Sequence, residues 1–151
     1  MRIALGSDHA GFRLKDEIAG ILREMGHEAI DLGTDSDESV DYPDFAVKVS
    51  ESILAGEADL GILVCGTGLG MAMAANKVPG IRAAAVSDTF SARAAREHND
   101  ANVLCIGARV VGSGLARDIV TSFLGASFQG GRHLRRVEKM KEIEKKYGGA
   151  R

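Results

Sequence analysis

Residues 61–77 read GILVCGTGLGMAMAANK, and they hold the clearest signal in the chain for both fold and function. A continuous apolar run ends at Cys65, a glycine-rich turn follows, and small residues come next. Such a run is typical of a strand that is buried on both faces, which predicts a strand over 60–65. The small residues after the turn predict a short helix over 70–77.

Strands and helices alternate on both sides of this stretch. Apolar patterns predict further strands over 3–6, 28–32, 82–86 and 103–107. Helices are predicted over 12–25, 43–54, 89–97, 115–123 and 132–147. This alternation predicts an α/β fold, in which a five-stranded parallel sheet carries helices on both faces. The chain of 151 residues contains no repeat or linker, so we expect one domain over 1–151.

Composition and charge disfavour several classes of protein. A net charge of −2 disfavours a nucleic-acid-binding function, which usually requires a strongly basic surface. The sequence has no apolar stretch of about 18 residues, so no membrane partner is expected. It also starts without the apolar core of a secretory signal, which favours a cytoplasmic location and free thiols at Cys65 and Cys105. No Cys/His spacing typical of zinc occurs, and no metal is expected.

Polar and glycine-rich segments follow four of the predicted strands. These segments are Ser7-Asp8-His9, residues 65–70, Ser87-Asp88 and Arg109. In open α/β sheets, ligands bind outside the carboxyl ends of the strands. We therefore expect a ligand site at this edge of the sheet.

The glycine turn does not match the common nucleotide-binding motifs. The pattern G-x-G-x-x-G requires a third glycine, and Met71 or Met73 stands there, depending on the starting glycine. A P-loop requires Gly-Lys-Ser/Thr, which does not occur in the turn. Asp31 alone favours a nucleotide, because an acid after the second strand can bind a ribose hydroxyl. The turn is interpreted as a general anion nest formed by the backbone N–H groups of residues 66–70.

Cys65 has two competing interpretations. A helix N-terminus favours the thiolate form of a cysteine, which could remove a proton beside a carbonyl group while the backbone amides hold the enolate oxygen. Cys65 could equally be a small apolar residue at a strand end, since free cysteine is among the most buried residue types. Cys105 lies between Leu104 and Ile106 in the middle of a predicted strand, and we interpret it as a packing residue.

Five parts of the sequence resemble the type B ribose-5-phosphate isomerases, a family that also contains galactose-6-phosphate and allose-6-phosphate isomerases. They are SDHAG (7–11), DYPDFA (41–46), CGTGLGM with AANK (65–71 and 74–77), REHNDANVL (96–104) and GGRHLRRV (130–137). The resemblance covers nearly the whole chain. It implies a Rossmann-like α/β/α sandwich that requires no cofactor or metal and forms a homodimer or a dimer of dimers.

The resemblance also implies a reaction, the interconversion of ribose 5-phosphate and ribulose 5-phosphate through a cis-enediolate. Cys65 matches the catalytic base, which moves a proton between C2 and C1. Some members use a glutamate six residues later, but Met71 stands there and residues 65–77 contain no acid. Thr67 matches the residue that assists proton movement between the oxygens. His98 matches the histidine that opens the sugar ring, with Asp8 as the nearby acid.

Substrate binding is implied for several further residues. Asn99 matches a residue that binds a substrate hydroxyl or the enediolate, although it could equally just end a helix. The spacing of Arg132 and Arg136 places both on one helix face, where they suit a phosphate group. His9 and Arg109 match further positions near the phosphate. Tyr42 lies in a predicted loop, where it could touch the sugar or equally just brace the turn before Pro43. The remaining candidates are the glycines of the nest, Gly66, Gly68 and Gly70.

Three functions of different classes follow from these patterns. The first is an aldose–ketose isomerase that acts on ribose 5-phosphate, or on a hexose 6-phosphate such as allose or galactose 6-phosphate. The second is a nucleotide-binding module, and the third is a noncatalytic oligomeric scaffold. The isomerase alone accounts for Cys65, His98 and the arginine pair together. The helix over 132–147 has an apolar stripe that could pack on a partner subunit. Because the resemblance implies a shared active site, we expect this helix to carry its arginines into the active site of the partner.

Overall fold

The computed structural model describes residues 1–148, and it has the alternating order that the sequence predicts. The strands are β1 (Arg2–Ser7), β2 (Glu28–Asp31), β3 (Leu60–Cys65), β4 (Ala83–Ala85) and β5 (Val103–Gly107). The helices are α1 (Phe12–Glu24), α2 (Tyr42–Leu54), α3 (Leu69–Ala75), α4 (Thr89–Asn99), α5 (Ser113–Leu124) and α6 (Arg132–Tyr147). The five strands form one parallel sheet in the order β2-β1-β3-β5-β4, which confirms the predicted fold class.

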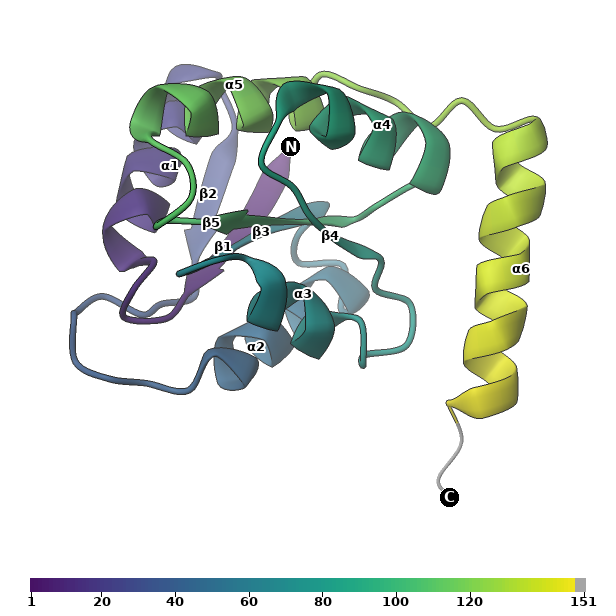
Figure 1. The fold of residues 1–151 in the computed structure, drawn as a ribbon, viewed down its shortest axis with the longest axis horizontal. Helices are drawn as coiled ribbons and strands as arrows, with labels where there is room; N and C mark the ends of the chain where they lie inside the picture. Colours follow the sequence, from purple (N-terminus) through teal and green to yellow (C-terminus); the bar gives the residue numbers. More distant parts are fainter. Residues whose placement is uncertain (149–151) are drawn as a thin grey trace.

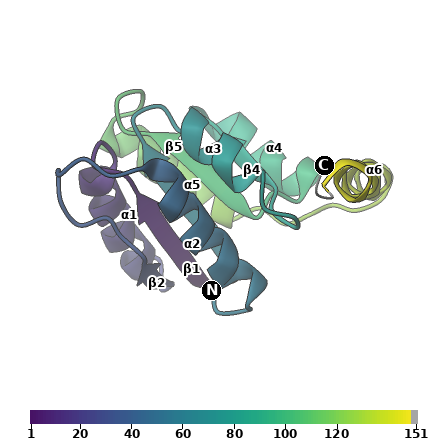
Figure 2. The ribbon, with the colours of Figure 1, turned by 90° about the horizontal axis from the view of Figure 1, so that it is seen from below.

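Helices cover both faces of the sheet (Figures 1 and 2). Helices α1, α4 and α5 lie on one face, and α2 and α3 lie on the other. Successive residues of β1 show how the strands separate the two layers. Ile3 and Leu5 pack among α1 and α5, whereas Ala4 packs with α2 and α3. Each face therefore has its own apolar core, as expected for a three-layer α/β domain.

Strand β3 is the centre of the sheet. All of its residues, Leu60–Cys65, are buried, and it pairs with β1 on one side and with β5 on the other. A parallel strand covered by helices on both faces is apolar without interruption. This is the physical reason for the continuous apolar run that ends at Cys65.

The chain changes direction across the sheet between β1 and β3. After β1 it continues to β2 on one side, and after β3 it continues to β4 and β5 on the other. The connections leave neighbouring strand ends in opposite directions, and a crevice opens at such a point. Asp8 follows β1, and Cys65 ends β3, so these two residues border the crevice.

Two helix boundaries differ from prediction at candidate residues. Tyr42 was expected in a loop, but it is the first residue of α2, after Asp41 in the N-cap position. Helix α4 was expected to end at 97, but it runs to Asn99 because the left-handed residue that ends it is Asp100. His98 and Asn99 therefore belong to the last helical turn. The apolar pattern could not locate this end, since the final turn of α4 is polar.

A buried lysine joins α1 to β2. The Lys15 side chain is completely buried, and its Nζ lies 2.9 Å from Asp16 Oδ1 and 2.5 Å from Asp31 Oδ2. Asp31 Oδ1 also accepts a hydrogen bond of 2.9 Å from the Gly33 N–H. A buried ammonium requires such partners. The Asp31 carboxylate is thus occupied by Lys15 and Gly33, and this removes the one feature that favoured a nucleotide.

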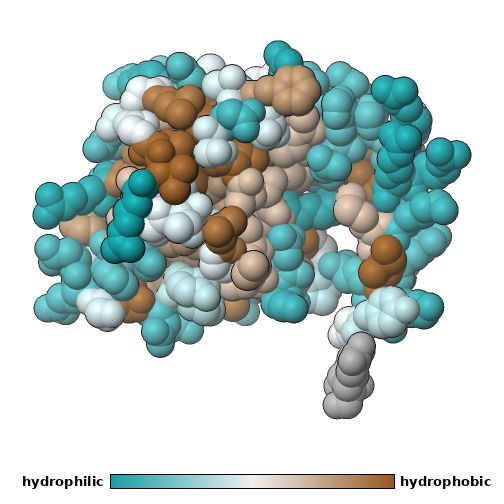
Figure 3. All heavy atoms as spheres, viewed as in Figure 1, coloured by the Kyte–Doolittle hydropathy of each residue, from teal (hydrophilic) through white to brown (hydrophobic). Residues whose placement is uncertain are grey.

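Helix α6 stands beside the rest of the molecule (Figures 1 and 2). Within Arg132–Tyr147 only Val137 is buried, while Met140, Ile143 and Tyr147 are exposed. An open cleft of about 490 Å³ separates these apolar side chains from the segment before β4, and Figure 3 shows it as a gap. No helix within residues 1–148 is long and apolar enough to cross a membrane.

Candidate active site

Cys65 lies at the crevice with its sulfur held by the glycine turn. Cys65 is buried, with 5% of the residue exposed, and Sγ accepts a hydrogen bond of 3.1 Å from the Gly68 N–H. Gly68 can present this N–H because it has a φ of 80°, a left-handed conformation that glycine adopts without strain. A thiolate accepts such a bond more strongly than a neutral thiol does. The turn therefore fixes the position of a sulfur that could carry charge.

The glycine turn packs closely on the end of β5. The Cys65 carbonyl accepts from the Ala108 N–H at 2.8 Å, and the Gly66 carbonyl accepts from the Arg109 N–H at 3.0 Å. A Cβ atom on Gly107 would lie only 2.7 Å from the Thr67 backbone, so this close approach requires glycine. The Arg109 side chain lies along Gly66, where a Cβ atom would be 3.2 Å from Nη1. Thr67 is exposed at the top of the turn.

The end of β1 brings Asp8 and His9 to the same edge. The Asp8 N–H donates to the Val64 carbonyl at 3.2 Å, and Asp8 Oδ1 accepts from the Ala10 and Gly11 N–H groups at 3.0 and 3.1 Å. His9 Nδ1 accepts from the Val40 N–H at 3.2 Å. An imidazole that accepts at Nδ1 carries its proton on Nε2 when neutral. His9 can therefore donate Nε2–H to an anion without carrying a net charge.

Tyr42 adds an aromatic ring to this edge. Its ring lies against Gly70, where a Cβ atom would come within 2.8–3.1 Å of the ring carbons. We call the residues gathered at the carboxyl ends of the strands the rim cluster. They are Asp8, His9, Tyr42, Cys65, Gly66, Thr67, Gly68, Gly70 and Arg109.

The other candidate residues form a second group, where α4 meets α6. The rings of His98 and His133 are stacked with centroids 4.3 Å apart and planes within 9°. The Gln129 N–H donates to the Glu97 carbonyl at 3.0 Å, which brings the start of α6 beside the end of α4. We call this group the α4–α6 cluster. Its members are His98, Asn99, Arg132, His133 and Arg136.

The two clusters lie at opposite ends of the strands. The rim cluster lies at the carboxyl ends, and the α4–α6 cluster lies at the amino ends. Helix α4 ends beside Asn102, just before β5, whereas Cys65 pairs with Gly107 at the far end of β5. The chain rises by about 3.3 Å per residue in a strand, so roughly 16 Å separate the two ends. Within one chain, His98 does not meet Cys65 or Asp8.

The α4–α6 cluster affects how stability depends on pH. Partial burial, together with the positive charges of His98, Arg132 and Arg136, lowers the pKa of His133 from its ordinary value of 6.5. As pH falls below about 6.5, the unfolded chain takes up a proton at this residue before the folded chain does. The folded protein therefore loses stability as pH falls through this range, and above it His133 has no such effect.

Replacing His133 with glutamine is expected to reduce this acid sensitivity. The melting temperature of the variant should fall less than that of the wild type between about pH 7.5 and pH 5.5. The measurement is thermal unfolding at several pH values. His27→Gln, at the N-terminal end of the sheet, is the matched control and should follow the wild type. Parallel pH curves for His133→Gln and the wild type would contradict this prediction.

Comparisons with known proteins agree with this geometry. A model of the ribose/galactose isomerase family matches residues 3–140. The chain belongs to the ribose/galactose isomerase family. Within this family, the ribose-5-phosphate isomerase B of Escherichia coli is 52% identical over 145 residues, covering 96% of this chain and 97% of that protein.

Solved structures of ribose/galactose isomerase family members have the same fold. The ribose-5-phosphate isomerase B of Clostridium thermocellum is 60% identical, with a TM-score of 0.96 over 97% of this chain and 99% of that chain. The Mycoplasma genitalium enzyme, solved with bound ribulose 5-phosphate, is 45% identical, with a TM-score of 0.90 over 95% of this chain and 96% of that chain. These matches confirm the resemblance seen in the sequence.

Some features of the site were not visible in the sequence. The stack of His133 on His98 and the Val40 contact with His9 depend on segments far apart in the chain, so no local pattern predicts them. Burial, with a smaller effect from Cys65, raises the pKa of Cys105 well above its usual range, in agreement with a packing role. Within residues 1–148, no group of three His, Cys, Asp or Glu side chains is placed to hold a metal ion.

Proposed function

We propose that this protein interconverts ribose 5-phosphate and ribulose 5-phosphate, with Cys65 as the base. The observation that carries the proposal is the placement of Cys65, whose sulfur lies at the crevice and accepts the Gly68 N–H. Residues 65–77 contain no carboxylate that could serve instead. Similar proteins are named ribose-5-phosphate isomerase B, and one of them was solved with bound ribulose 5-phosphate. Both observations support the choice of substrate.

The proton transfer uses the glycine turn. The Cys65 thiolate takes the proton from C2 of the open-chain aldose, an enediolate forms, and the same group returns the proton to C1. The exposed Thr67 hydroxyl, two residues away, moves a proton between the oxygens on C1 and C2. The backbone N–H groups of Gly66 and Gly70 belong to the turn that follows Cys65. We assign to them the stabilisation of the negative charge that develops on the enediolate oxygen.

Ring opening precedes this step, because ribose 5-phosphate is mostly a closed ring. We assign it to His98, whose imidazole can give and take a proton near neutral pH. Asp8 assists from the rim cluster, since its Oδ1 is used by Ala10 and Gly11 while Oδ2 accepts no hydrogen bond from residues 1–148. Asn99, beside His98, binds a hydroxyl of the opened sugar or the enediolate.

The phosphate group is bound by cations from both clusters. Arg132 and Arg136 lie one turn apart on α6 and can form forked hydrogen bonds with phosphate oxygens. From the rim cluster, His9 offers Nε2–H and Arg109 offers a guanidinium group. Within one chain, these donors lie at opposite ends of the strands. They can therefore reach one phosphate together only if a second chain supplies one of the two groups.

We infer a homodimer, or a dimer of dimers, with shared active sites. Roughly 16 Å of strand separates the clusters. Ribose 5-phosphate, with six bonds of about 1.5 Å from C1 to phosphorus, spans at most about 9 Å. Apolar side chains exposed on α3, Leu69 and Met73, border the rim cluster, and those of α6 border the open cleft. Figure 3 shows the apolar surface over α3, which a partner subunit would cover.

The proposed location is the cytoplasm. Both cysteines, Cys65 and Cys105, are free thiols in the structure. A thiol that acts as a base is lost when it is oxidised. A reducing compartment preserves the function that we assign to Cys65.

Conversion of ribose 5-phosphate to ribulose 5-phosphate by the purified protein tests the proposal. Allose 6-phosphate and galactose 6-phosphate serve as comparison substrates, and binding of ATP is tested by thermal shift. We expect the highest kcat/KM for the pentose phosphate and no stabilisation by ATP. Turnover of a hexose phosphate but not of ribose 5-phosphate would support the proposed proton transfer and contradict the proposed substrate. Stabilisation by ATP without any turnover would instead support the nucleotide-binding module.

A further inference from the structure

Asp100 ends helix α4 in an unusual backbone conformation. With a φ of 47° and a ψ of 43°, it is the one residue other than glycine with a positive φ among those that the structure describes. Glycine, or sometimes asparagine, is the usual residue at such a helix end. An aspartate here accepts some strain that glycine would avoid. An aspartate at this position therefore indicates that the side chain has a role beyond ending the helix.

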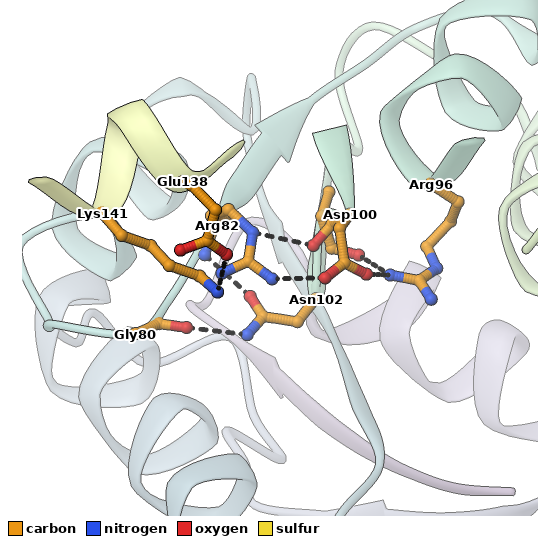
Figure 4. Close-up of polar contacts among 8 residues, drawn as sticks. Gly80, Arg82, Arg96, Asp100, Asn102, Glu138 and Lys141 are labelled. Carbon is orange, nitrogen blue, oxygen red and sulfur yellow. Dashed lines mark hydrogen bonds and ion pairs between the residues drawn. The ribbon is translucent and has the colours of Figure 1, made fainter. Parts of the chain in front are cut away.

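The Asp100 carboxylate bridges two arginines from different parts of the fold. Oδ2 lies 2.9 Å from Arg82 Nη2, and Oδ1 lies 3.0 Å from Arg96 Nη1. The same arginines also hold the backbone of the turn, because Arg82 Nε donates to the Asp100 carbonyl at 2.9 Å and Arg96 Nη1 donates to the Ala101 carbonyl at 2.6 Å. Figure 4 shows this arrangement, with Asp100 between the two guanidinium groups.

The bridge is partly shielded from solvent. The side chains of Arg82, Arg96 and Asp100 are 21%, 15% and 34% exposed. Ion pairs such as Arg13–Asp37 and Arg117–Glu24 are more exposed. Charge-assisted hydrogen bonds are stronger than neutral ones and are less screened when partly buried. The end of α4 is thus held by four such bonds rather than by its own backbone alone.

Helix α6 lies against the same bridge. Figure 4 shows Glu138 and Lys141 of α6 beside Arg82. The Lys141 ammonium lowers the pKa of Glu138, and the charges of Lys145 and Arg82 lower it further. Arg82 therefore interacts with Asp100 at the end of α4 and with the acidic side chain of α6. The bridge lies where the two helices of the α4–α6 cluster meet.

We propose that Asp100 is a positioning residue that holds the last turn of α4 and so orients the imidazole of His98 toward the sugar. The inference rests on the proposed function, in which His98 opens the ring. His98 lies two residues before Asp100, so the arginine bridge supports its turn of α4. The stack on His133 and the backbone bond between Gln129 and Glu97 hold the same turn from the segment that leads into α6. A displacement of about 1 Å in a catalytic group can reduce the rate by about a hundredfold.

Asp100→Gly tests the inference, because glycine keeps the left-handed conformation and removes only the carboxylate. We expect a roughly tenfold to hundredfold loss of kcat/KM in an otherwise wild-type protein. In a His98→Ala background, the same change should produce little further loss, since the group that it positions is already gone. Asp100→Asn, which retains one acceptor, should recover part of the activity.

The matched control is Asp59→Gly, which removes another Asp–Arg pair at the amino edge of the sheet. Asp59 bonds Arg2 at 2.8 Å and does not touch α4. This variant should keep wild-type kcat/KM. Equal losses from Asp100→Gly in both backgrounds, or no loss in either, would overturn the inference. Full activity of the His98→Ala single variant would instead refute the ring-opening role of His98. The single variant thus tests the proposed function separately from the role of Asp100.

Discussion

Replacing Cys65 with alanine is expected to lower kcat for ribose 5-phosphate by at least about 10²–10⁴-fold, the usual contribution of a positioned base. No carboxylate in residues 65–77 can replace the thiol. The fold should survive, because alanine fills most of the same space at the end of β3. Steady-state kinetics and thermal unfolding of the variant provide the measurement. A kcat within tenfold of the wild type would show that Cys65 is a packing residue.

Cys105→Ala is the matched control for that experiment. Cys105 lies in the neighbouring strand, and its side chain is completely buried. Its removal leaves a small cavity, which is expected to cost about 1 kcal/mol of the free energy of unfolding and to leave kcat unchanged. Loss of activity in both variants would indicate a general defect of the sheet rather than loss of a base.

Mixing inactive Cys65→Ala protein with inactive Arg136→Ala protein is expected to restore about a quarter of the wild-type activity. Half of the randomly paired dimers contain one chain of each kind, and one of their two shared sites is then intact. The measurement is activity at low substrate concentration after the two proteins are dissociated and reassociated together. Exchange of subunits is followed with a tag on one variant.

A second mixture is the control for subunit exchange. Arg132→Ala and Arg136→Ala change the same cluster, so every site in their mixed dimers lacks one arginine. This mixture should recover nothing beyond the activity of the separate variants. If the first mixture also recovers nothing although hybrids form, each site is built from a single chain, and the shared-site proposal is wrong.

Much of the rim cluster could be predicted from the sequence. The uninterrupted apolar run before Cys65 identified the central strand, and ligands bind outside the carboxyl ends of such strands. The structure brings Asp8, Thr67 and Arg109 to that edge as expected. The placement of these residues could be predicted because it depends on short segments, in which strand periodicity and turn chemistry agree. Their roles in the reaction stay predictions.

The position of His98 relative to Cys65 depends on topology rather than on local pattern. A helix between two parallel strands runs back across the sheet, so its last turn lies at the amino edge. That rule also places His98 far from Cys65, but this separation was not predicted from the sequence. The polar last turn concealed the true end of α4. The burial of Lys15 could not be predicted either. A lysine in a helix is usually exposed, and its partner Asp31 lies far away in the sequence.

The separation of the two clusters has an evolutionary consequence under the shared-site proposal. Each chain would supply two half-sites that never meet within it, and each half could be lost independently. After gene duplication, one copy could lose Cys65 while the other loses Arg136, and the pair would still form one working site per dimer. Selection would then maintain two different chains together, because neither alone would be active. Under this proposal, the separation of the two half-sites within one chain is the structural condition that allows a duplicated gene to become two genes that are both required.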